Sequence, residues 1–298
     1  MPVYTKNSKL SLKGDLLVFV SSMLFASYPL FLRLNPDTST LLFLFAFQVV
    51  GAGFFAIVFL KHGLPKISPH IILLLGLLAL FCILHDFTYF FSFRLTSVAN
   101  AAVGHQTVSI FLLFLAPYFL KEKTNHAEWI AVVLGILGTI ILFFDAHQQI
   151  DMSHSKEGIV LSIFSGLLYA LLIILYRYLQ NKINLPLQTI NFFRYIISIT
   201  LLLPFMLFFG RFHATPKTVW TLIIFGLLYA VLASSIQQVA MKWSRVLHIS
   251  VIGKSEPAFA MLYALLFLKE VPHWNAIIGG AMIIGTSLWL VTCTKEID

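Results

Sequence analysis

Ten long apolar runs, separated by short polar links, dominate the pattern of hydrophobic and polar positions along the chain. A transmembrane helix needs about 20 predominantly apolar residues, with a range of roughly 17 to 25. The runs are close to this length, so the pattern predicts ten membrane-spanning helices. They are Leu16–Leu32, Ser39–Leu60, Ile71–Phe93, Val98–Leu120, Ala127–Phe144, Gly158–Leu175, Leu187–Phe209, Val219–Ala240, Leu247–Leu268 and Ala276–Val291.

The ten runs fall into two sets of five that resemble each other at a spacing of 144 to 148 residues. The matched positions are Gly14 with Gly158, Arg33 with Arg177, Phe47-Gln48 with Phe193-Arg194, Leu120-Lys121-Glu122 with Leu268-Lys269-Glu270, and Gly138-Thr139 with Gly285-Thr286. Because five is odd, the second set enters the membrane from the opposite side. The sequence therefore predicts an all-α integral membrane protein with two inverted five-helix repeats, residues 14–144 and 158–291, an organisation typical of secondary transporters.

Composition excludes a water-soluble fold. The 298 residues are 59% hydrophobic and only 11% charged, against roughly 25% charged in soluble domains. The net charge of +8 raises nucleic-acid binding as an alternative. We reject it, because the basic residues lie mostly in short links between apolar runs, where they set topology. The two cysteines, Cys82 and Cys293, lack metal-ligand spacing, so we expect neither a disulfide framework nor a metal site.

The Lys and Arg positions predict the orientation. With the N-terminus inside, 12 of the 20 basic residues fall on the inner side and 6 on the outer side, while Arg194 and Lys254 lie within spans. This bias predicts that both termini lie in the cytoplasm, and we expect the membrane to be a bacterial inner membrane. The first run follows Lys6, Lys9 and Lys13 in the manner of a secretory signal, but it is long enough to span and has its own repeat copy, so we expect a membrane helix.

Small residues mark predicted helix contacts, because they let membrane helices approach closely. They lie four apart at Ala131, Gly135 and Thr139 in the fifth run, and at Ala276 and Gly280 in the tenth. Packing within one chain and a homodimer interface are both open from this pattern, so the sequence allows a monomer or a homodimer.

Several of these features resemble the drug/metabolite transporter superfamily and, within it, the ten-helix EamA-type permeases. They are the doubled five-span unit, the short link Thr96–Ala102, and the Lys-Glu that ends the fourth and ninth runs. Glu256-Pro257 resembles the Glu-Pro common in the ninth span of that family, whereas Val108-Ser109 at the matching place in the first half lacks the proline. The resemblance covers Gly14–Val291 and implies transport of a small metabolite, with the cargo left open.

Four charged residues lie within predicted spans: Asp86, Arg194, Lys254 and Glu256. An ionisable side chain at bilayer depth is costly and normally faces the bundle interior or a water-filled cavity. Two alternatives are open. The residues form structural ion pairs, Arg194 with Glu256 and Lys254 with Asp86, or at least one pair lines a central cavity and meets a charged or zwitterionic substrate.

The strongest local signal is at Glu256, because Pro257 removes the backbone donor that would bond the Gly253 carbonyl. We expect a kink over Gly253–Pro257 that exposes polar backbone to a cavity. The neighbouring Gly253-Lys254-Ser255 resembles the end of a phosphate-binding loop, but His248 stands where its first glycine is required. We therefore expect no ATPase, and transport that is passive or ion-coupled.

A second polar cluster lies on the third and fourth runs, where His85, Asp86 and Tyr89 precede His105. Histidine titrates near neutral pH, so these groups could carry a proton. The open alternative is an interhelical hydrogen-bond network. The predicted proton-coupling residues are His85, Asp86 and Glu256, and the predicted substrate-binding residues are Gln48, Tyr89, His105, Tyr169, Arg194, Gln237, Lys254 and Glu256.

These observations predict a secondary transporter for an amino acid or related amphipathic solute that works by alternating access. They favour export over uptake. The alternative cargo is a nucleoside-like metabolite such as S-adenosylmethionine, taken up rather than exported. From another class, an intramembrane enzyme would need a reactive motif, and we find no H-E-x-x-H or G-x-S-x-G. A scaffold is disfavoured by the charged interior. We expect no cofactor, and the lipid bilayer and a small-molecule substrate as partners.

Overall fold

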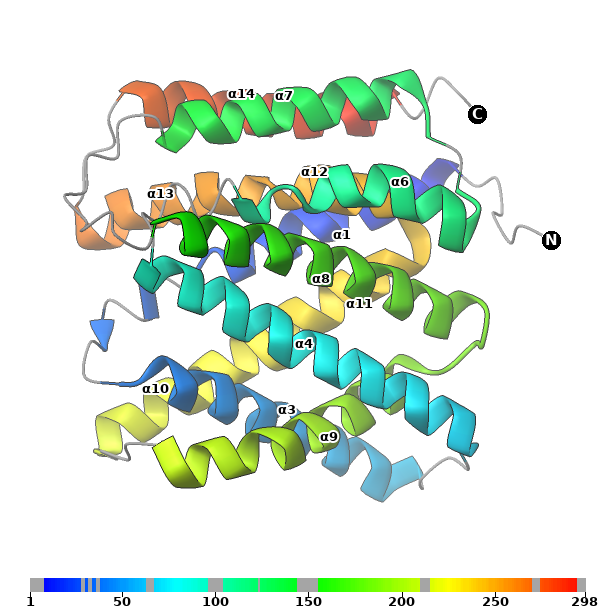
Figure 1. Ribbon diagram of the computed structural model, residues 1–298, viewed down its shortest axis with the longest axis vertical. Coiled ribbons are helices and arrows are strands. Elements are labelled where there is room, and N and C mark those ends of the chain that lie inside the picture. Colours follow the sequence, from blue (N-terminus) through cyan, green and yellow to red (C-terminus); the bar gives the residue numbers. More distant parts are fainter. Residues whose placement is uncertain are drawn as a thin grey trace.

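The chain forms a bundle of helices that run roughly side by side (Figure 1). The computed structural model describes residues 8–27, 30–31, 34–35, 38–62, 67–95, 104–122, 124–143, 155–209, 215–269 and 274–293. Arg33, Glu270 and the Thr96–Ala102 link lie outside these ranges. We call residues 8–143 the N-terminal half and residues 155–293 the C-terminal half.

Within the described ranges the secondary structure is helical, without a strand. The N-terminal half contains α1 (Ser8–Phe25), α3 (Thr40–His62), α4 (Pro69–Leu95), α6 (Val108–Leu120) and α7 (His126–Phe143). The C-terminal half contains α8 (Ser155–Asn181), α9 (Leu187–Phe209), α10 (Pro216–Gly226), the π-helix η2 (Leu227–Ala233), α11 (Ser234–Trp243), α12 (Val246–Gly253), α13 (Ser255–Leu268) and α14 (Trp274–Cys293).

Six helical segments of the described chain are long and apolar enough to cross a membrane. They are Leu41–Phe59, Pro69–Ser92, Lys156–Asn181, Leu187–Phe209, Pro216–Trp243 and Val246–Phe267, and three shorter apolar helices cover Val108–Leu120, His126–Ile141 and Ile277–Thr292. The protein is therefore a multi-pass integral membrane protein. The count of ten spans and their inverted arrangement stay predictions.

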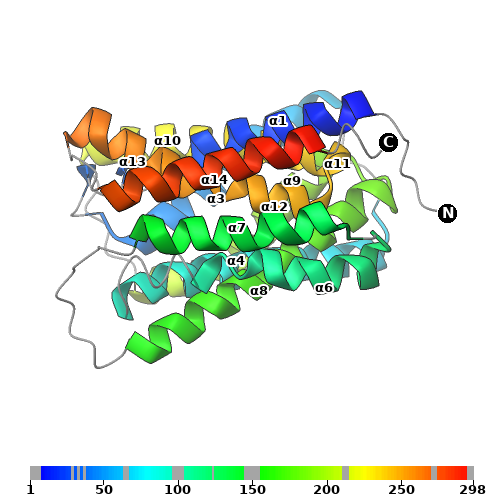
Figure 2. The same cartoon turned by 90° about the horizontal axis from the view of Figure 1, so that it is seen from above.

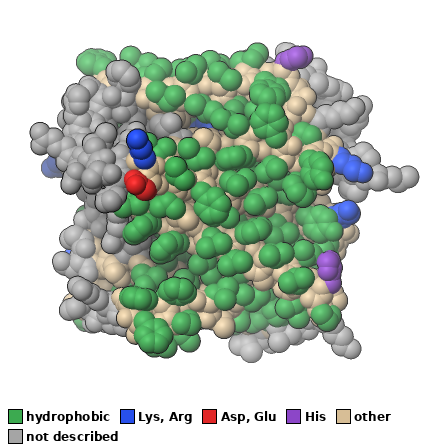
Figure 3. Space-filling view, viewed as in Figure 1, with side chains coloured by type: hydrophobic (Ala, Val, Ile, Leu, Met, Phe, Trp, Pro, Cys, Tyr) green, Lys and Arg blue, Asp and Glu red, His purple; other side chains and the backbone are tan. Residues whose placement is uncertain are grey.

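The outer surface of the bundle is apolar, as a lipid-facing surface must be. Figure 3 shows hydrophobic side chains over the broad middle of one face, with charged side chains and histidines toward its margins. Large side chains that would be buried in a soluble protein are exposed on several helices, including Phe208 of α9, Leu73 of α4 and Val160 of α8. Lipid takes the place of a protein core around this belt.

The helices of the two halves pair with one another across the bundle. α7 packs against α14 and α3 against α9, while α4 packs against α8 and α1 against α11. In the sequence repeat, α3 matches α9 and α7 matches α14, so these two pairings each join matching helices. In the same repeat, α1 matches α8 and α4 matches α11. Swapping the two halves therefore turns the α4–α8 pairing into the α1–α11 pairing. This pairing pattern is the one that a two-fold relation between the halves requires.

The Lys-Glu pairs that end the matched helices share one backbone feature. Lys121 after α6 has φ of 59° and Lys269 after α13 has φ of 58°. A left-handed residue at this position ends a helix and turns the chain away from its axis. The repeated sequence therefore encodes a repeated helix end, and at the first of them it directs Glu122 into the protein, where it is buried.

The predicted kink in the ninth run is present, as an interruption between α12 and α13. Lys254 is a turn residue between the two helices, three positions before Pro257. The N-terminal half is interrupted at the matching place, because Gln106 and Thr107 form a turn ahead of α6, although Ser109 stands at the position that matches Pro257. There the Thr107 hydroxyl donates to the Gly104 carbonyl at 2.6 Å and holds the turn.

The two interruptions touch each other through Lys254, which lies 148 residues after Gln106 in the repeat. Its Nζ donates to the Gln106 carbonyl oxygen at 3.0 Å and lies 3.4 Å from Gln106 Oε1. The lysine side chain is fully buried and lies where Gly135 of α7 leaves room for it. The point where both helices break is thus also a point where the halves meet.

The small residues predicted to form packing seams lie inside the chain. Ala131, Gly135 and Thr139 are buried on α7, which packs against α14. At Gly138 of the same helix, an added Cβ would lie 2.9 Å from Ile283 Cγ1 and 3.2 Å from the Gly279 carbonyl oxygen. These residues therefore serve packing within one chain; whether a second copy binds is not tested by them.

We predict that Gly138→Leu destabilises the protein, because the new side chain overlaps α14 backbone. Overpacking typically costs about 1–3 kcal/mol, which should lower the melting temperature in detergent. The matched control is Gly53→Leu on α3, where an added Cβ meets nothing within 4 Å. Equal melting temperatures for the two variants would contradict the packing of α7 on α14.

We predict that Lys254→Met raises the melting temperature in detergent. A buried ammonium with neutral partners carries a desolvation cost of several kcal/mol, whereas the lost hydrogen bonds are worth about 1–3 kcal/mol. Methionine keeps the packing against Gly135. The control Lys242→Met, at an exposed lysine of α11, should change little. A lower melting temperature for Lys254→Met alone would show that the contact with Gln106 outweighs desolvation.

Candidate functional site

A cavity of about 160 Å³ lies between the two halves. A water molecule in the liquid occupies about 30 Å³, so this space can hold a small solute or several waters. Its walls come from both halves: Ser22, Phe25, Phe47, Cys82, His85, Asp86, Tyr89, Phe90, His105, Gln106, Val108, Tyr169, Leu172, Tyr176, Arg194, Tyr229, Ser234, Gln237, Gln238, Met241, Ile249, Ser250, Gly253, Glu256 and Pro257.

Most of the side chains singled out from the sequence line this cavity. They are His85, Asp86, Tyr89, His105, Tyr169, Arg194, Gln237 and Glu256. The other two do not. Lys254 points to Gln106, and Gln48 of α3 is buried with its Oε1 unpaired within the described residues. Their parts in substrate binding or proton coupling stay predictions.

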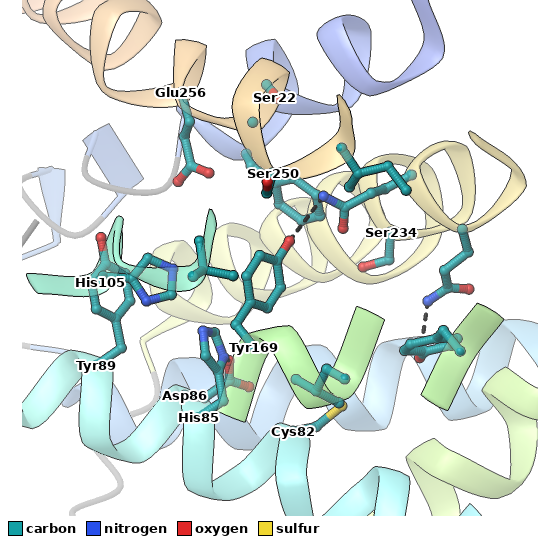
Figure 4. A pocket seen from close by; sticks show the side chains of 18 of the residues that line it. Ser22, Cys82, His85, Asp86, Tyr89, His105, Tyr169, Ser234, Ser250 and Glu256 are labelled. Carbon is teal, nitrogen blue, oxygen red and sulfur yellow. Dashed lines mark hydrogen bonds and ion pairs between the residues drawn. The ribbon is translucent and has the colours of Figure 1, made fainter. Parts of the chain in front are cut away.

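One wall of the cavity is a cluster of four rings, two imidazoles and two phenols. The ring centres are 4.2 Å apart for Tyr89 and His105, 5.0 Å for His85 and Tyr169, and 5.2 Å for His85 and His105. Figure 4 shows the four side chains facing one another from α4, α8 and the segment before α6. Such a wall offers flat apolar faces with polar edges, which suits an amphipathic ligand.

Hydrogen bonds fix the orientation of these rings. His105 Nδ1 is 2.9 Å from Ser165 Oγ on α8, and His85 Nδ1 is 2.9 Å from Asp86 Oδ1. Gln237 Nε2 donates to the Tyr169 hydroxyl at 3.0 Å. His85 Nε2 is buried without a hydrogen-bond partner among the described residues. A bound solute or water could therefore bond to it.

Glu256 and Arg194 bring opposite charges to the same cavity without pairing. In Figure 4 the Glu256 carboxylate extends from the first turn of α13 into the open space. It has no hydrogen bond or ion pair with any described residue. Arg194 of α9 lies with its guanidinium 3.8 Å from the centre of the Tyr195 ring, and its buried Nε has no partner in the described part of the chain.

The structural ion pairs considered from the sequence are therefore not formed. Among the described residues, Asp86 pairs with His85 rather than Lys254, and Arg194 has no carboxylate partner. The alternative, in which charged side chains line a central cavity, is the one that this geometry favours. Arg194 meets the Cys82 thiol and the Tyr195 ring but no carboxylate among the described residues. A buried charge without an opposite charge is costly in a membrane, and a ligand of matching charge would offset that cost.

The backbone around the cavity is interrupted or irregular in three places. The breaks at Gln106 and Lys254 border it. The π-helix η2 contains Tyr229 and ends just before Ser234, and both residues line the cavity. The Tyr229 carbonyl accepts from the Ser234 backbone N–H and also from Ser234 Oγ at 2.8 Å. π-helical turns occur frequently at functional sites.

A second group of charges lies at the end of the bundle where α1 begins, on the right in Figure 1. We call this the N-terminal end, and we call its six buried or half-buried residues the ionic cluster. The three acids come from the N-terminal half and the three bases from the C-terminal half: Asp15, Glu122 and Glu128, and Arg177, Arg245 and His248.

Ion pairs in this cluster join the halves directly. Arg177 Nε lies 3.0 Å from Glu122 Oε1, and Arg245 Nε lies 2.9 Å from Glu128 Oε1. Arg177 also donates to the carbonyl oxygens of Met241 and Ser244, which end α11. The end of α8 is thereby fixed to the link between α11 and α12 and to the end of α6.

His248 of α12 lies between two acids of the other half. Its Nδ1 is 3.0 Å from Asp15 Oδ2 on α1, and its Nε2 is 3.6 Å from Glu128 Oε1 on α7. Asp15 also accepts a hydrogen bond from the Ser244 hydroxyl. All of these side chains are fully buried or nearly so. The N-terminal end of the bundle therefore contains buried charges that pair across the two halves.

Sequence reasoning missed this cluster as a functional feature. Arg177 and Glu122 were noted only as repeat positions, and Asp15, Glu128 and His248 were not considered as site residues. No residue pattern signals this pairing, because Lys13, Lys121 and His126 stand close to these acids in the sequence and are the nearer candidate partners. Within the described ranges, no three His, Cys, Asp or Glu side chains are placed so that they could hold a metal ion.

Comparisons with known proteins agree with the architecture. The model of the EamA-like transporter family matches residues 12–144 and again residues 156–292. An uncharacterized transporter of Archaeoglobus fulgidus is 25% identical over 95% of this chain and 99% of its own length. The S-adenosylmethionine uptake transporter of Rickettsia conorii is 22% identical, covering 81% of this chain and 78% of its own.

A crystal structure also shares the fold. It superimposes with a TM-score of 0.80 at 16% sequence identity, covering 94% of this chain and 98% of that chain. At this identity the likeness concerns the fold alone. The two family matches together span most of the sequence, and the chain belongs to the EamA-like transporter family.

Proposed function

We propose that the chain is a secondary transporter that moves an amino acid or a similar zwitterionic, amphipathic solute by alternating access. The observation that carries this proposal is the central cavity, where Glu256 and Arg194 present opposite unpaired charges beside a wall of rings. A zwitterion can satisfy both charges, and an apolar or aromatic portion can lie against the rings. Family membership supports transport but leaves the cargo open.

The proposed movement depends on two inverted five-helix halves. Two observations support this arrangement. The helix pairings between the halves are the same when the halves are swapped, and the two helix interruptions are in contact at Gln106 and Lys254. With the ionic cluster intact, the N-terminal end is closed. Breaking the cluster would let the halves separate there while they close at the opposite end, so the cavity would face the two sides in turn.

We further propose export from the cytoplasm, with both termini inside a bacterial or archaeal cytoplasmic membrane. The bias of basic residues supports this orientation, and the described relatives include bacterial and archaeal proteins. In this orientation the ionic cluster lies at the cytoplasmic end. His85, Asp86 and Glu256 are the cavity groups that could carry a coupled proton, because each lines the solute space and each has an ionisable side chain.

Uptake of a nucleoside-like metabolite such as S-adenosylmethionine is the second candidate. The name of the Rickettsia conorii relative motivates it, and the ring wall gives it a physical basis, since a planar base could stack on Tyr169 and His85. The two candidates differ in the group that meets the rings: a side chain of an amino acid in the first, a heteroaromatic base in the second.

We predict that Glu256→Gln and Arg194→Gln each reduce flux of the transported solute at least about tenfold, because loss of one charged contact of about 1.4 kcal/mol has that effect. Purified variants would be reconstituted in liposomes and tested for counterflow of labelled amino acids and S-adenosylmethionine without ATP. The folded yield in detergent should stay near that of the wild type, since neither residue forms an ion pair in the described chain.

Two exposed charges provide matched controls, Glu157→Gln at the start of α8 and Lys217→Gln in α10. Both should transport like the wild type. Normal flux in the two cavity variants would show that the substrate does not meet these charges. Loss of folded protein in both would instead assign them a structural role.

We predict that Tyr169→Leu weakens binding of solutes with a planar or aromatic group more than binding of small aliphatic solutes. Tyr169→Phe keeps the ring and should preserve this preference while losing only the bond from Gln237. The measurement is thermal stabilisation by a metabolite library, because a ligand that binds only the native state raises its melting temperature. Equal losses for both solute classes would remove the ring wall from the substrate site.

A further inference from the structure

His248 is placed where a neutral imidazole cannot satisfy its surroundings. Both ring nitrogens face carboxylates, Nδ1 at 3.0 Å from Asp15 Oδ2 and Nε2 at 3.6 Å from Glu128 Oε1. A neutral imidazole has one N–H and one lone pair. Whichever tautomer forms, one carboxylate would face the lone pair, and the closed arrangement gains a second attractive contact only when one more proton is bound.

The charge balance of the ionic cluster leads to the same requirement. Three carboxylates, Asp15, Glu122 and Glu128, meet two guanidinium groups, Arg177 and Arg245. With a neutral His248 the buried cluster carries a net charge of −1, and with one additional proton it is neutral. An uncompensated buried charge is costly, so proton binding stabilises the closed cluster.

The described side chains of the other elements that pack against α12 do not supply this missing positive charge. α6 and α14 contain no acidic or basic residue. On α1 and α11 the other charged side chains that the structure describes near this end are Lys13 and Lys242, which are exposed, and Lys13 Nζ lies 5.4 Å from the centre of the Trp243 ring. The side chain of Lys9, also on α1, lies outside the described residues. His126 of α7 is exposed as well, and Glu256 of α13 lines the cavity.

We propose that Asp15, His248 and Glu128 form a proton-binding site that locks the N-terminal end of the transporter. With the proton bound, His248 attracts both acids of the other half and the halves stay joined. When the proton leaves, one of these contacts becomes repulsive and the end opens more readily. The site lies apart from the cavity groups considered above for proton coupling, so one proton could bind here without meeting the solute.

The direction of the pH effect follows from linkage. The closed state binds the proton more tightly than the open state, so raising the pH favours opening of the N-terminal end. For one proton the ratio of open to closed molecules changes by up to about tenfold per pH unit. The coupling of proton release to transport rests on the proposed function. The proton-dependent contact between the halves does not, because it is a property of the fold.

The test is a distance measurement across the N-terminal end by pulsed electron spin resonance, which needs no substrate. Spin labels are attached to Ile130→Cys on α7 and Lys182→Cys after α8, both exposed and in different halves, in a Cys82→Ala, Cys293→Ala background. In liposomes between about pH 5.5 and about pH 8.5, a range that brackets histidine titration, the longer-distance population should grow with pH. His248→Gln should abolish this dependence.

The matched control is His70→Gln, an exposed histidine at the start of α4 near the same end, which should keep the wild-type response. A wild-type distance distribution that does not change with pH would overturn the inference, and this outcome requires no variant to fold. So would an unchanged pH response in His248→Gln. Distances that change with pH in a protein without solute flux would support the proton-binding site and contradict the transport function. Solute flux with distances that do not change with pH would support the transport function and contradict the proton-binding site.

Discussion

Attraction between buried charges of the two halves at one end of the bundle is the interaction on which the rest of the structure depends. The N-terminal half contributes Asp15, Glu122 and Glu128, and the C-terminal half contributes the bases that meet them. In lipid there is no hydrophobic force to press helices together, so polar contacts and close packing must hold a bundle. Here the ion pairs join one half to the other.

The cavity takes its properties from that arrangement. It lies between halves that are joined at one end by the ionic cluster and in the middle by Lys254 and Gln106. The two interruptions fall at matching positions of the repeat, yet one is followed by Pro257 and the other by Ser109. The break thus does not depend on proline. The N-terminal half forms its turn with the Thr107 hydroxyl bonded to the Gly104 carbonyl.

Chemical asymmetry between the halves coincides with the cavity. The matched positions Ser109 and Pro257, and Gln48 and Arg194, share a backbone frame but differ in side chain. Glu256 and Arg194, both from the C-terminal half, bring unpaired charges, whereas the N-terminal half contributes His85, Tyr89 and His105 to the wall of rings. Under the proposed function, a frame shared between the halves would permit the exchange of shapes, and the unlike side chains would give the cavity its selectivity.

Much of this could be predicted from the sequence, for a physical reason. A polar residue inside an apolar run has nowhere to lie except the bundle interior, and so Asp86, Arg194 and Glu256 were correctly placed toward an interior space. The length of apolar runs such as that of α9 predicts the helices in the same way. Family membership followed from the doubled pattern and the Lys-Glu helix ends.

Other features could not be predicted, because the same reasoning fails at helix ends. A charge there can face water, lipid head groups or another helix, and the sequence does not distinguish these surroundings. Asp15, Glu128 and His248 therefore seemed ordinary although they are the most buried charges at that end. The contact of Lys254 could not be predicted for a different reason: its partner is a backbone carbonyl exposed by a helix break 148 residues earlier, which no residue type signals.

The most direct test of the central claim, that the ionic cluster closes one end of the cavity, uses Cys82, a buried free thiol in the cavity wall. In oriented liposomes of a Cys293→Ser variant, a membrane-impermeant maleimide is added to either side. We predict that Cys82 reacts slowly from the side of the ionic cluster, and that Arg177→Gln with Arg245→Gln accelerates reaction from that side. Equal rates from that side with the cluster intact or broken, in protein that remains folded, would contradict the claim.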